Sequence, residues 1–386
     1  MTIRLGLEVF LEETVGEVAG KRLGLVACPS SVDRELRSSV ERLYRHPAID
    51  LVALFGPEHG LRGEAQAGVP VATYKDALTG LPVHSLYGDA RRPSPDMLRG
   101  IDAIIIDLQD GGLRFYTFLA TALYVMEAAA AAGCKVILLD RPAPITGSRI
   151  EGPMLDADFA SFVGPYPMPI RYGMTIGEMA QMANSEHGIN CDLTVIAMQG
   201  WERNMWFDDT GLPFVPSSPN LPTLDTMTLY PGACLIEGSN LSEGRGSTKP
   251  FEYIGAPWID ALQLADQLND LDLKGARFRP VYFVPTFSKY RGELCAGVHI
   301  HVTDRERFLP VAMILNLLQT VIASYPEDFA WRAPWAAGSK APIDLLSGGT
   351  SVREHLNARR PVEELIASWR PGIVEFLRTR QGYLLY

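Results

Sequence analysis

Short apolar runs rich in Val, Ile and Leu recur over the first 140 residues of the chain, and each run ends in polar residues or in Gly and Pro. Runs of this length are typical of strands that are buried on both faces of a parallel sheet. These runs cover residues 22–28, 50–55, 83–87, 102–108 and 135–140.

Helix-like stretches lie between these runs. Residues 38–45 have a helical pattern, and the Ala-rich stretch 117–132 stops at Gly133, which suits the left-handed residue that ends many helices. Alternating strands and helices predict an α/β fold with a doubly wound, mostly parallel sheet that is covered on both faces. In such sheets the ligand binds outside the carboxyl ends of the strands.

The pattern changes in the later part of the chain. Residues 211–232 form an irregular stretch with five prolines, and a long loop of this kind is usually functional. A second unit follows, so we expect two domains, residues 1–250 and a smaller α/β domain at residues 251–386. The other expected helices are 175–186, 258–268 and 308–324, and the other expected strands are 193–198, 281–286 and 296–302.

Charge and composition narrow the class of partner. The formal net charge is −10 and Lys and Arg form no cluster, so neither nucleic acid nor an anionic membrane is expected as a partner. The five cysteines lie far apart, without a zinc or disulfide spacing. The first residues lack the apolar core of a signal peptide, and no apolar window reaches the ~18 residues of a membrane span. A cytoplasmic protein with a small-molecule or neutral polymer substrate is therefore expected.

The segment PEHGLRGE follows directly after the predicted strand 50–55 and carries Glu58, His59 and Arg62. Its glycines and proline predict a tight loop at the carboxyl edge of the sheet, where catalytic groups are common. Glu58, held in such a loop, is a candidate general acid. The alternative is a simple turn with a salt-bridged glutamate.

The segment DLQDGGLRFYT also runs from a strand end through a glycine turn into a helix. Asp107 and Asp110 can bind sugar hydroxyls or serve as second carboxylates, while Arg114 and Tyr116 can hold an anionic or ring substituent. The alternative makes Asp110 a turn or cap residue and Arg114 its partner. At the next strand end, Asp140-Arg141 fits a structural ion pair at least as well as a ligand contact.

The segment EGSNLSEGRGST is dense in polar residues on a glycine-rich backbone, which suggests a ligand site. Its candidate side chains are Glu237, Asn240, Glu243 and Arg245, and Asn220 precedes them in the motif SPNLP. The alternative is a solvated loop whose Ser and Asn side chains satisfy their own backbone.

No phosphate loop, nucleophile elbow, HExxH motif or dinucleotide-binding glycine motif is present. His299 and His301 share a strand face, but without a third ligand they do not predict a metal site. No cofactor is therefore expected. Paired carboxyl groups without a cofactor are the usual machinery of glycosidic bond cleavage.

The chain resembles the exo-β-N-acetylmuramidase family, long known as a domain of unknown function. The resemblance rests on six motifs in order, which cover nearly the whole chain. They are PEHGLRGEAQAG, DLQDGGLRFYTF, EGPMLD, PIRYGMTIGEMA, PNLPTLDTMTLYPG and EGSNLSEGRGSTKPFEYIGAPWID.

This resemblance implies a Rossmann-like first domain that binds no nucleotide, a smaller second domain and a cleft between them. It also implies release of terminal N-acetylmuramic acid from the non-reducing end of peptidoglycan fragments, which fits recycling of cell-wall material. Glu58 is then the acid, and the acetamido group of the sugar can replace an enzymic nucleophile. Asp110 or Glu243 would orient the acetamide.

The lactyl carboxylate of muramic acid would need a cation, for which Arg62, Arg114 and Arg245 are candidates. Two rival hypotheses stay open at this point. One is a metal-assisted hydrolase that uses Glu58 with His59 and the two aspartates of the second loop. The other is a binding protein that closes on a sugar without chemistry.

Overall fold

The computed structural model of the protein describes residues 3–386 apart from 64, 67, 70–71, 89 and 335–337. The chain folds into two compact units and passes between them several times. Unit 1 consists of Met1–Arg149, Gly173–Pro222 and Arg378–Tyr386, and unit 2 of Ile150–Tyr172 and Thr223–Leu377. The expected boundary near residue 250 differs from this division, since residues 223–250 belong to unit 2.

Helix α6 (Leu224–Ala233) explains the difference in the boundary. The stretch 211–232 was expected to be irregular throughout, because Pro231 and Gly232 are typical loop residues. They lie in the last turn of α6, whose start is capped by the Thr223 side chain, which accepts a hydrogen bond from the Thr226 amide. Helix α6 packs against α8 (Pro310–Ser324) within unit 2, and this contact overrides the local signal.

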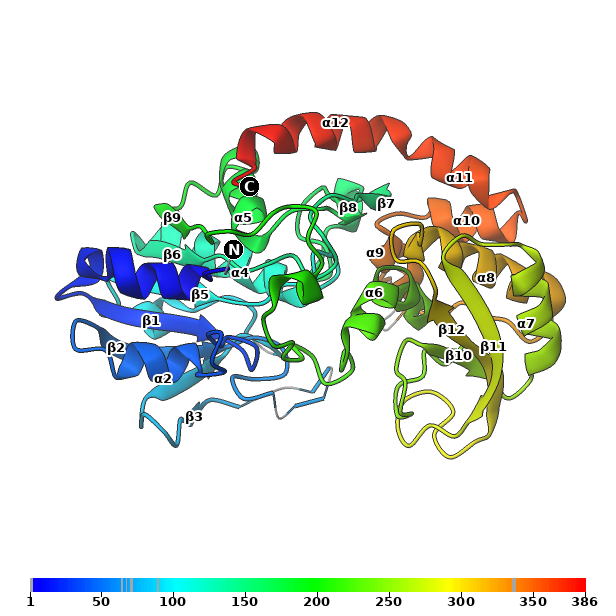
Figure 1. Ribbon diagram of the computed structural model, residues 1–386, viewed down its shortest axis with the longest axis horizontal. Helices are drawn as coiled ribbons and strands as arrows, with labels where there is room; N and C mark the ends of the chain where they lie inside the picture. Colours follow the sequence, from blue (N-terminus) through cyan, green and yellow to red (C-terminus); the bar gives the residue numbers. More distant parts are fainter. Residues whose placement is uncertain (1–2, 64, 67, 70–71, 89, 335–337) are drawn as a thin grey trace. The chain divides into compact units, whose positions relative to one another are not determined.

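Unit 1 contains a seven-stranded sheet with the order β3-β4-β2-β1-β5-β6-β9 (Figure 1). Every neighbouring pair is parallel except β3 and β4, and the order runs outward from β1 in both directions, so the doubly wound, Rossmann-like fold is confirmed. All five apolar runs form strands. The bounds are β1 (Arg22–Ala27), β2 (Asp50–Gly56), β3 (Tyr74–Lys75), β4 (Pro82–Ser85), β5 (Ala103–Asp107), β6 (Lys135–Leu139) and β9 (Leu193–Ile196).

The helices of unit 1 follow the expected pattern most closely at α4 (Thr117–Ala132), which ends at Gly133 with a φ of 66°. Helix α5 (Ile176–Glu186) begins at Thr175, whose side chain forms a capping box with Glu178. The remaining helical segments are α1 (Gly6–Val9), η1 (Phe10–Thr14), η2 (Val15–Val18), α2 (Ser39–Tyr44), α3 (Pro95–Leu98), η4 (Phe207–Thr210) and η6 (Gln381–Tyr383).

The last residues of the printed sequence return to unit 1 and fill a polar position beside β6. The Tyr386 hydroxyl donates to Asp140 Oδ2 at 2.8 Å and accepts from the Met198 amide at 2.7 Å. The Leu385 amide donates to the buried Glu178 carboxylate at 2.8 Å. Residues 378–386 are therefore bonded to buried carboxylates of unit 1, although most of their side chains are exposed or partly exposed.

Unit 2 contains a three-stranded antiparallel sheet with the order β10-β12-β11 and a set of helices that includes α8 (Figure 1). A small hairpin pairs β7 with β8. The strands are β7 (Glu151–Met154), β8 (Pro169–Arg171), β10 (Tyr253–Ala256), β11 (Ala276–Phe283) and β12 (Cys295–Val302). The other helical segments are η3 (Ala157–Phe159), η5 (Cys234–Gly238), α7 (Ala261–Asp270), α9 (Pro342–Ser347), α10 (Ser351–Asn357), α11 (Val362–Ser368) and α12 (Arg370–Arg380), whose last turn belongs to unit 1.

Two glycines face each other where β10 and β12 pair. Gly255 and Gly297 are register partners, and a Cβ atom on Gly297 would lie 2.0 Å from the Ile254 carbonyl oxygen and 2.6 Å from the Gly255 Cα. No side chain fits at that distance. The pairing of β10 with β12 therefore depends on the absence of a side chain at residue 297.

Among the described residues, every helix is too short or too polar to cross a bilayer.

Replacing Gly297 by Ala is expected to destabilise unit 2, because the added methyl must push β10 away from β12. Overpacking of this kind costs about 1–3 kcal/mol. The matched control is Gly349→Ala, since a Cβ atom there meets nothing within 4 Å. Thermal unfolding of both variants checks this, and equal midpoints would contradict the close approach.

Candidate functional site

A buried ion pair joins two strand ends at the carboxyl edge of the unit 1 sheet. Arg141, after β6, donates from Nε to Asp107 Oδ1 at 2.5 Å and from Nη2 to Asp107 Oδ2 at 2.9 Å. The side chains of Asp107 and Arg141 are 0% and 4% exposed. Arg141 Nη2 also donates to the Val32 carbonyl at 2.9 Å, in the loop after β1. The arginine therefore pairs with Asp107 and not with its neighbour Asp140.

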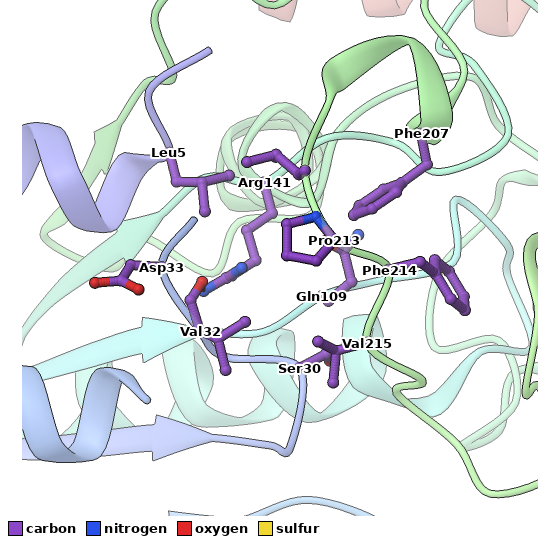
Figure 2. A pocket seen from close by; sticks show the side chains of 11 residues that line it. Leu5, Ser30, Val32, Asp33, Gln109, Arg141, Phe207, Pro213, Phe214 and Val215 are labelled. Atoms are coloured by element: carbon purple, nitrogen blue, oxygen red, sulfur yellow. Dashed lines mark hydrogen bonds between the residues drawn. The ribbon is translucent and has the colours of Figure 1, made fainter. Parts of the chain in front are cut away.

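The point where nucleotides bind in doubly wound folds lies between the ends of β1 and β5, and side chains such as Arg141, Pro213 and Phe214 line a small cavity there (Figure 2). The cavity has a volume of about 20 Å³. Ligand pockets for small molecules usually have ~300–1,000 Å³, so this cavity is well below that size. Its wall includes Ser30, Gln109, Arg141, Phe207, Pro213, Phe214 and Val215.

Glu58 lies in the loop after β2 and is 9% exposed. Its Oε2 accepts a hydrogen bond from the Thr117 hydroxyl at 2.8 Å, and its Oε1 accepts one from the Gly68 amide at 3.2 Å. Glu58 forms no ion pair with any residue that the structure describes, so the alternative of a salt-bridged turn glutamate does not account for its position. The carboxyl is instead held by neutral donors.

The backbone of this loop is tightly turned. His59 has a φ of 73° and Gly60 a φ of 80°, and His59 Nδ1 lies 3.0 Å from the Ala65 carbonyl oxygen. A non-glycine residue in the left-handed region is uncommon and is often associated with function. The turn aligns Glu58 and fixes the His59 ring against its own loop.

Arg62, a candidate for binding an anion, is already paired. Its Nη2 donates to Asp76 Oδ1 at 2.6 Å and its Nε donates to the same oxygen at 3.2 Å. Burial of Asp76 opposes its ionisation, but the hydrogen bonds from Arg62 and Thr79 outweigh burial and lower the pKa of Asp76. The guanidinium of Arg62 therefore has a structural partner that a substrate would have to replace.

The loop between β5 and α4 places the next candidates. Asp110 Oδ2 accepts a hydrogen bond from the Gly112 amide at 2.6 Å, as expected of a turn residue. Arg114 is fully buried, and this burial lowers its pKa to about 9, so it stays charged at neutral pH. The Tyr116 hydroxyl is hydrogen-bonded to the Ser217 hydroxyl.

The pKa of Tyr116 depends on the burial of its hydroxyl and on the charged groups near it. Burial raises the pKa of Tyr116 well above its usual value, and the charges of Asp110 and Glu58 add to this effect. The carboxyls of Asp110 and Glu58 therefore act on the same hydroxyl. A further link connects Asn220 Nδ2 to Gln66 Oε1 at 3.2 Å. Hydrogen bonds thus link the Glu58 loop, the loop between β5 and α4, and residues 217–220 within unit 1.

Unit 2 holds the remaining candidates around a charge cluster in which Glu243 is buried while Glu237 and Arg245 are partly exposed. Arg245 Nε donates to Glu237 Oε1 at 2.8 Å, and the same nitrogen lies 3.4 Å from Glu243 Oε1. Burial raises the pKa of Glu237, and the positive charge of Arg245 opposes this only in part. Lys289 Nζ lies 3.0 Å from Glu243 Oε2 and donates to the Leu241 carbonyl at 2.7 Å.

Asn240 has a structural role in the same motif. Its Nδ2 donates to the Asp328 carbonyl at 2.8 Å, and its Oδ1 accepts from the Ala330 amide at 3.0 Å. Both ends of the amide are occupied by backbone groups. The local-bonding alternative for this loop therefore does not describe Asn240, because its partners lie 88 and 90 residues further along the chain.

Two residues with direct contacts to the candidates were not singled out from the sequence. Thr117 is the last residue of the segment DLQDGGLRFYT, but nothing in the local pattern indicates that its hydroxyl contacts Glu58. Lys289 lies in the loop between β11 and β12, far along the chain from Glu243, and only the folded structure reveals the contact.

Together, the fold and these loops define a two-unit α/β protein whose Rossmann-like sheet carries buried carboxyls at its carboxyl edge. The chain belongs to the exo-β-N-acetylmuramidase NamZ family. The model of the N-terminal part of that family matches residues 23–225, and the model of the C-terminal part matches residues 228–386.

Relatives and solved structures agree with this membership. The chain is 47% identical over 384 residues to the peptidoglycan β-N-acetylmuramidase NamZ of Bacillus subtilis strain 168, which covers 100% of this chain and 91% of the relative. A DUF1343 family protein of Bacteroides fragilis shares 38% identity with a TM-score of 0.90. A second such protein from that organism shares 28% identity with a TM-score of 0.78. Both alignments cover 100% of this chain and 99% of the other.

Replacing Arg141 by Met is expected to lower the stability of unit 1 by about 3–5 kcal/mol, because Asp107 is left buried without its counter-charge. Urea unfolding measures the loss. The double variant D107N/R141M removes the uncompensated charge and should recover part of it. A double variant less stable than R141M alone would contradict this account.

Proposed function

We propose that the chain is an exo-β-N-acetylmuramidase that removes β-linked N-acetylmuramic acid from the non-reducing end of peptidoglycan fragments. Membership of the family over both of its parts and the 47% identity to the B. subtilis enzyme support this proposal. Disaccharides of N-acetylmuramic acid and N-acetylglucosamine, or muropeptides, are the substrates we propose. Use of these fragments in cytoplasmic recycling remains a prediction.

Glu58 is the general acid in this scheme, and the observation that carries the assignment is its buried carboxyl, held by the Thr117 hydroxyl and the Gly68 amide. A carboxyl held by neutral donors rather than by a counter-charge can exchange a proton with a substrate without breaking an ion pair. Glu58 gives its proton to the glycosidic oxygen as the bond between that oxygen and C1 breaks.

The acetamido group of the sugar supplies the nucleophile. Its carbonyl oxygen forms a bond to C1, and water then opens the resulting ring as the Glu58 carboxylate takes a proton from that water. Of the two candidates to orient the acetamide, we favour Asp110. It lies in the loop that leads to Thr117, whose hydroxyl is hydrogen-bonded to Glu58, whereas Glu243 is held by Lys289 and Arg245.

Arg245 is the cation that we propose for the lactyl carboxylate. Arg62 is paired with Asp76, and Arg114 is fully buried. The Arg245 side chain, in contrast, is 15% exposed. Its Nε and Nη2 atoms contact Glu237, whereas its Nη1 is buried and has no hydrogen-bond partner among the described residues. A guanidinium with a spare donor is suited to bind a carboxylate.

Replacing Glu58 by Gln is expected to reduce hydrolysis of the disaccharide N-acetylmuramic acid–N-acetylglucosamine by about 10²–10⁴-fold, the usual contribution of a general acid. Released monosaccharides are measured by mass spectrometry. Glu17→Gln, an exposed carboxyl in unit 1, is the matched control. Near-wild-type release by E58Q would remove Glu58 from the mechanism.

The same assay separates the rival hypotheses. Activity that is lost on exhaustive chelation and restored by a divalent ion would favour the metal-assisted hydrolase. Tight binding of N-acetylmuramic acid without turnover over days would favour a binding protein. The proposed mechanism requires turnover that does not change with chelator.

Replacing Arg245 by Met is expected to abolish discrimination between N-acetylmuramic acid and N-acetylglucosamine as competitive inhibitors, because the two sugars differ by the lactyl group. The readout is the ratio of the two inhibition constants, which is insensitive to the fraction of folded enzyme. Arg245→Lys keeps the charge and should keep part of the ratio. An unchanged ratio in R245M would assign the lactyl contact to another residue.

A further inference from the structure

We infer that Thr117 is a positioning residue for Glu58, whose hydroxyl stays hydrogen-bonded to Oε2 in both protonation states of the carboxyl. This inference rests on the proposed role of Glu58 as acid and base. Three features of unit 1 support it. Each oxygen of the Glu58 carboxyl accepts from a different kind of donor, a hydroxyl can both donate and accept a hydrogen bond, and the start of α4 fixes the position of Thr117.

The two oxygens of Glu58 have different kinds of partner. Oε1 accepts from the Gly68 amide at 3.2 Å, and an amide N–H can only donate. The lone-pair position of Oε1 that faces Gly68 is therefore closed to a proton. Oε2 accepts from the Thr117 hydroxyl at 2.8 Å. Each oxygen keeps a second lone-pair position, which can carry the proton that is given to the leaving oxygen.

A hydroxyl is the partner that suits a group which gains and loses a proton. It donates to the carboxylate and, after rotation about its C–O bond, accepts from the protonated acid. An amide or an ammonium would favour the carboxylate alone, and a carbonyl would favour the acid alone. When substrate is bound and the proton of Glu58 is turned to the leaving oxygen, the Thr117 hydroxyl donates to Oε2 again. Oε2 therefore keeps a hydrogen-bond partner while Glu58 gives its proton to the leaving oxygen and later takes one from water.

The position of this hydroxyl is rigid. Thr117 is the first residue of α4, a helix of 16 residues, and the next residues Phe118 and Leu119 are 1% and 0% exposed. On the other side, the neighbouring Tyr116 is tied to Ser217. Threonine is β-branched, so its χ1 angle has few accessible values in a helix. The helix start therefore sets where Oε2 lies.

The test compares Thr117→Val, which keeps the shape and removes the hydroxyl, with Thr117→Ser, which keeps the hydroxyl. Each variant is assayed on two substrates, the disaccharide of N-acetylmuramic acid and N-acetylglucosamine and the 4-nitrophenyl glycoside of N-acetylmuramic acid. The sugar leaving group needs protonation by an acid, whereas 4-nitrophenolate is stable enough to leave with little help.

Thr117→Val is expected to lower kcat/KM on the disaccharide by about 10–100-fold, a fraction of the full contribution of a general acid, and on the aryl glycoside by less than about threefold. The loss should lie in kcat, with KM within about threefold. Thr117→Ser should stay within about threefold of wild type on both substrates. The ratio of the two kcat/KM values does not depend on how much of the variant is folded.

Thr121→Val is the matched control, because Thr121 lies one turn further along α4 and is fully buried, and its hydroxyl has no partner within the described part of the chain. It should leave both substrates unaffected. Equal losses of T117V on the two substrates, or no loss on the disaccharide, would overturn the inference. Glu58→Gln is run in parallel: if it shows the leaving-group dependence and T117V does not, the role of Thr117 fails while that of Glu58 stands. If E58Q lacks the dependence, the proposed role of Glu58 fails, and the role of Thr117 falls with it.

Discussion

The ion pair between Asp107 and Arg141 holds the carboxyl edge of the unit 1 sheet in one arrangement. Its side chains come from the ends of β5 and β6, and Arg141 also bonds the loop after β1 through the Val32 carbonyl. Because a buried pair of this kind is costly to break, the three strand ends are fixed relative to one another. The loop that begins after Asp107 leads to Thr117, whose hydroxyl is hydrogen-bonded to Glu58. The geometry at the candidate acid therefore depends on the ion pair between Asp107 and Arg141.

The parts of the fold that could be predicted from sequence are those in which local pattern and tertiary packing agree. Strands of the central sheet are buried on both faces, so they appear as apolar runs, and α4 was placed at its observed bounds because Gly133 marks its end. Helix α6 could not be predicted, since Pro231 and Gly232 are loop signals that its packing against α8 overrides. The same helix accounts for the difference between the expected boundary near residue 250 and the start of the second segment of unit 2 at Thr223.

The candidate site shows a different limit. Charged residues at strand ends are visible in the sequence, but their partners are not. Arg62 is paired with Asp76, and Asp107 with Arg141, through contacts that only the fold brings about. Glu58 differs from these residues, because neutral donors and not a counter-charge hold its carboxyl. A hydroxyl such as that of Thr117 has no distinctive neighbours in the sequence, so its role emerges only from the distance between two atoms.

The return of residues 378–386 to unit 1 has a consequence for how the chain folds during synthesis. Asp140 receives the Tyr386 hydroxyl, yet the ribosome makes all of unit 2 between these two residues. Domains usually fold in order as they emerge. Here the hydrogen bond from Tyr386 to Asp140 can form only after all of unit 2 has been translated, so unit 1 cannot be completed before unit 2 has left the ribosome.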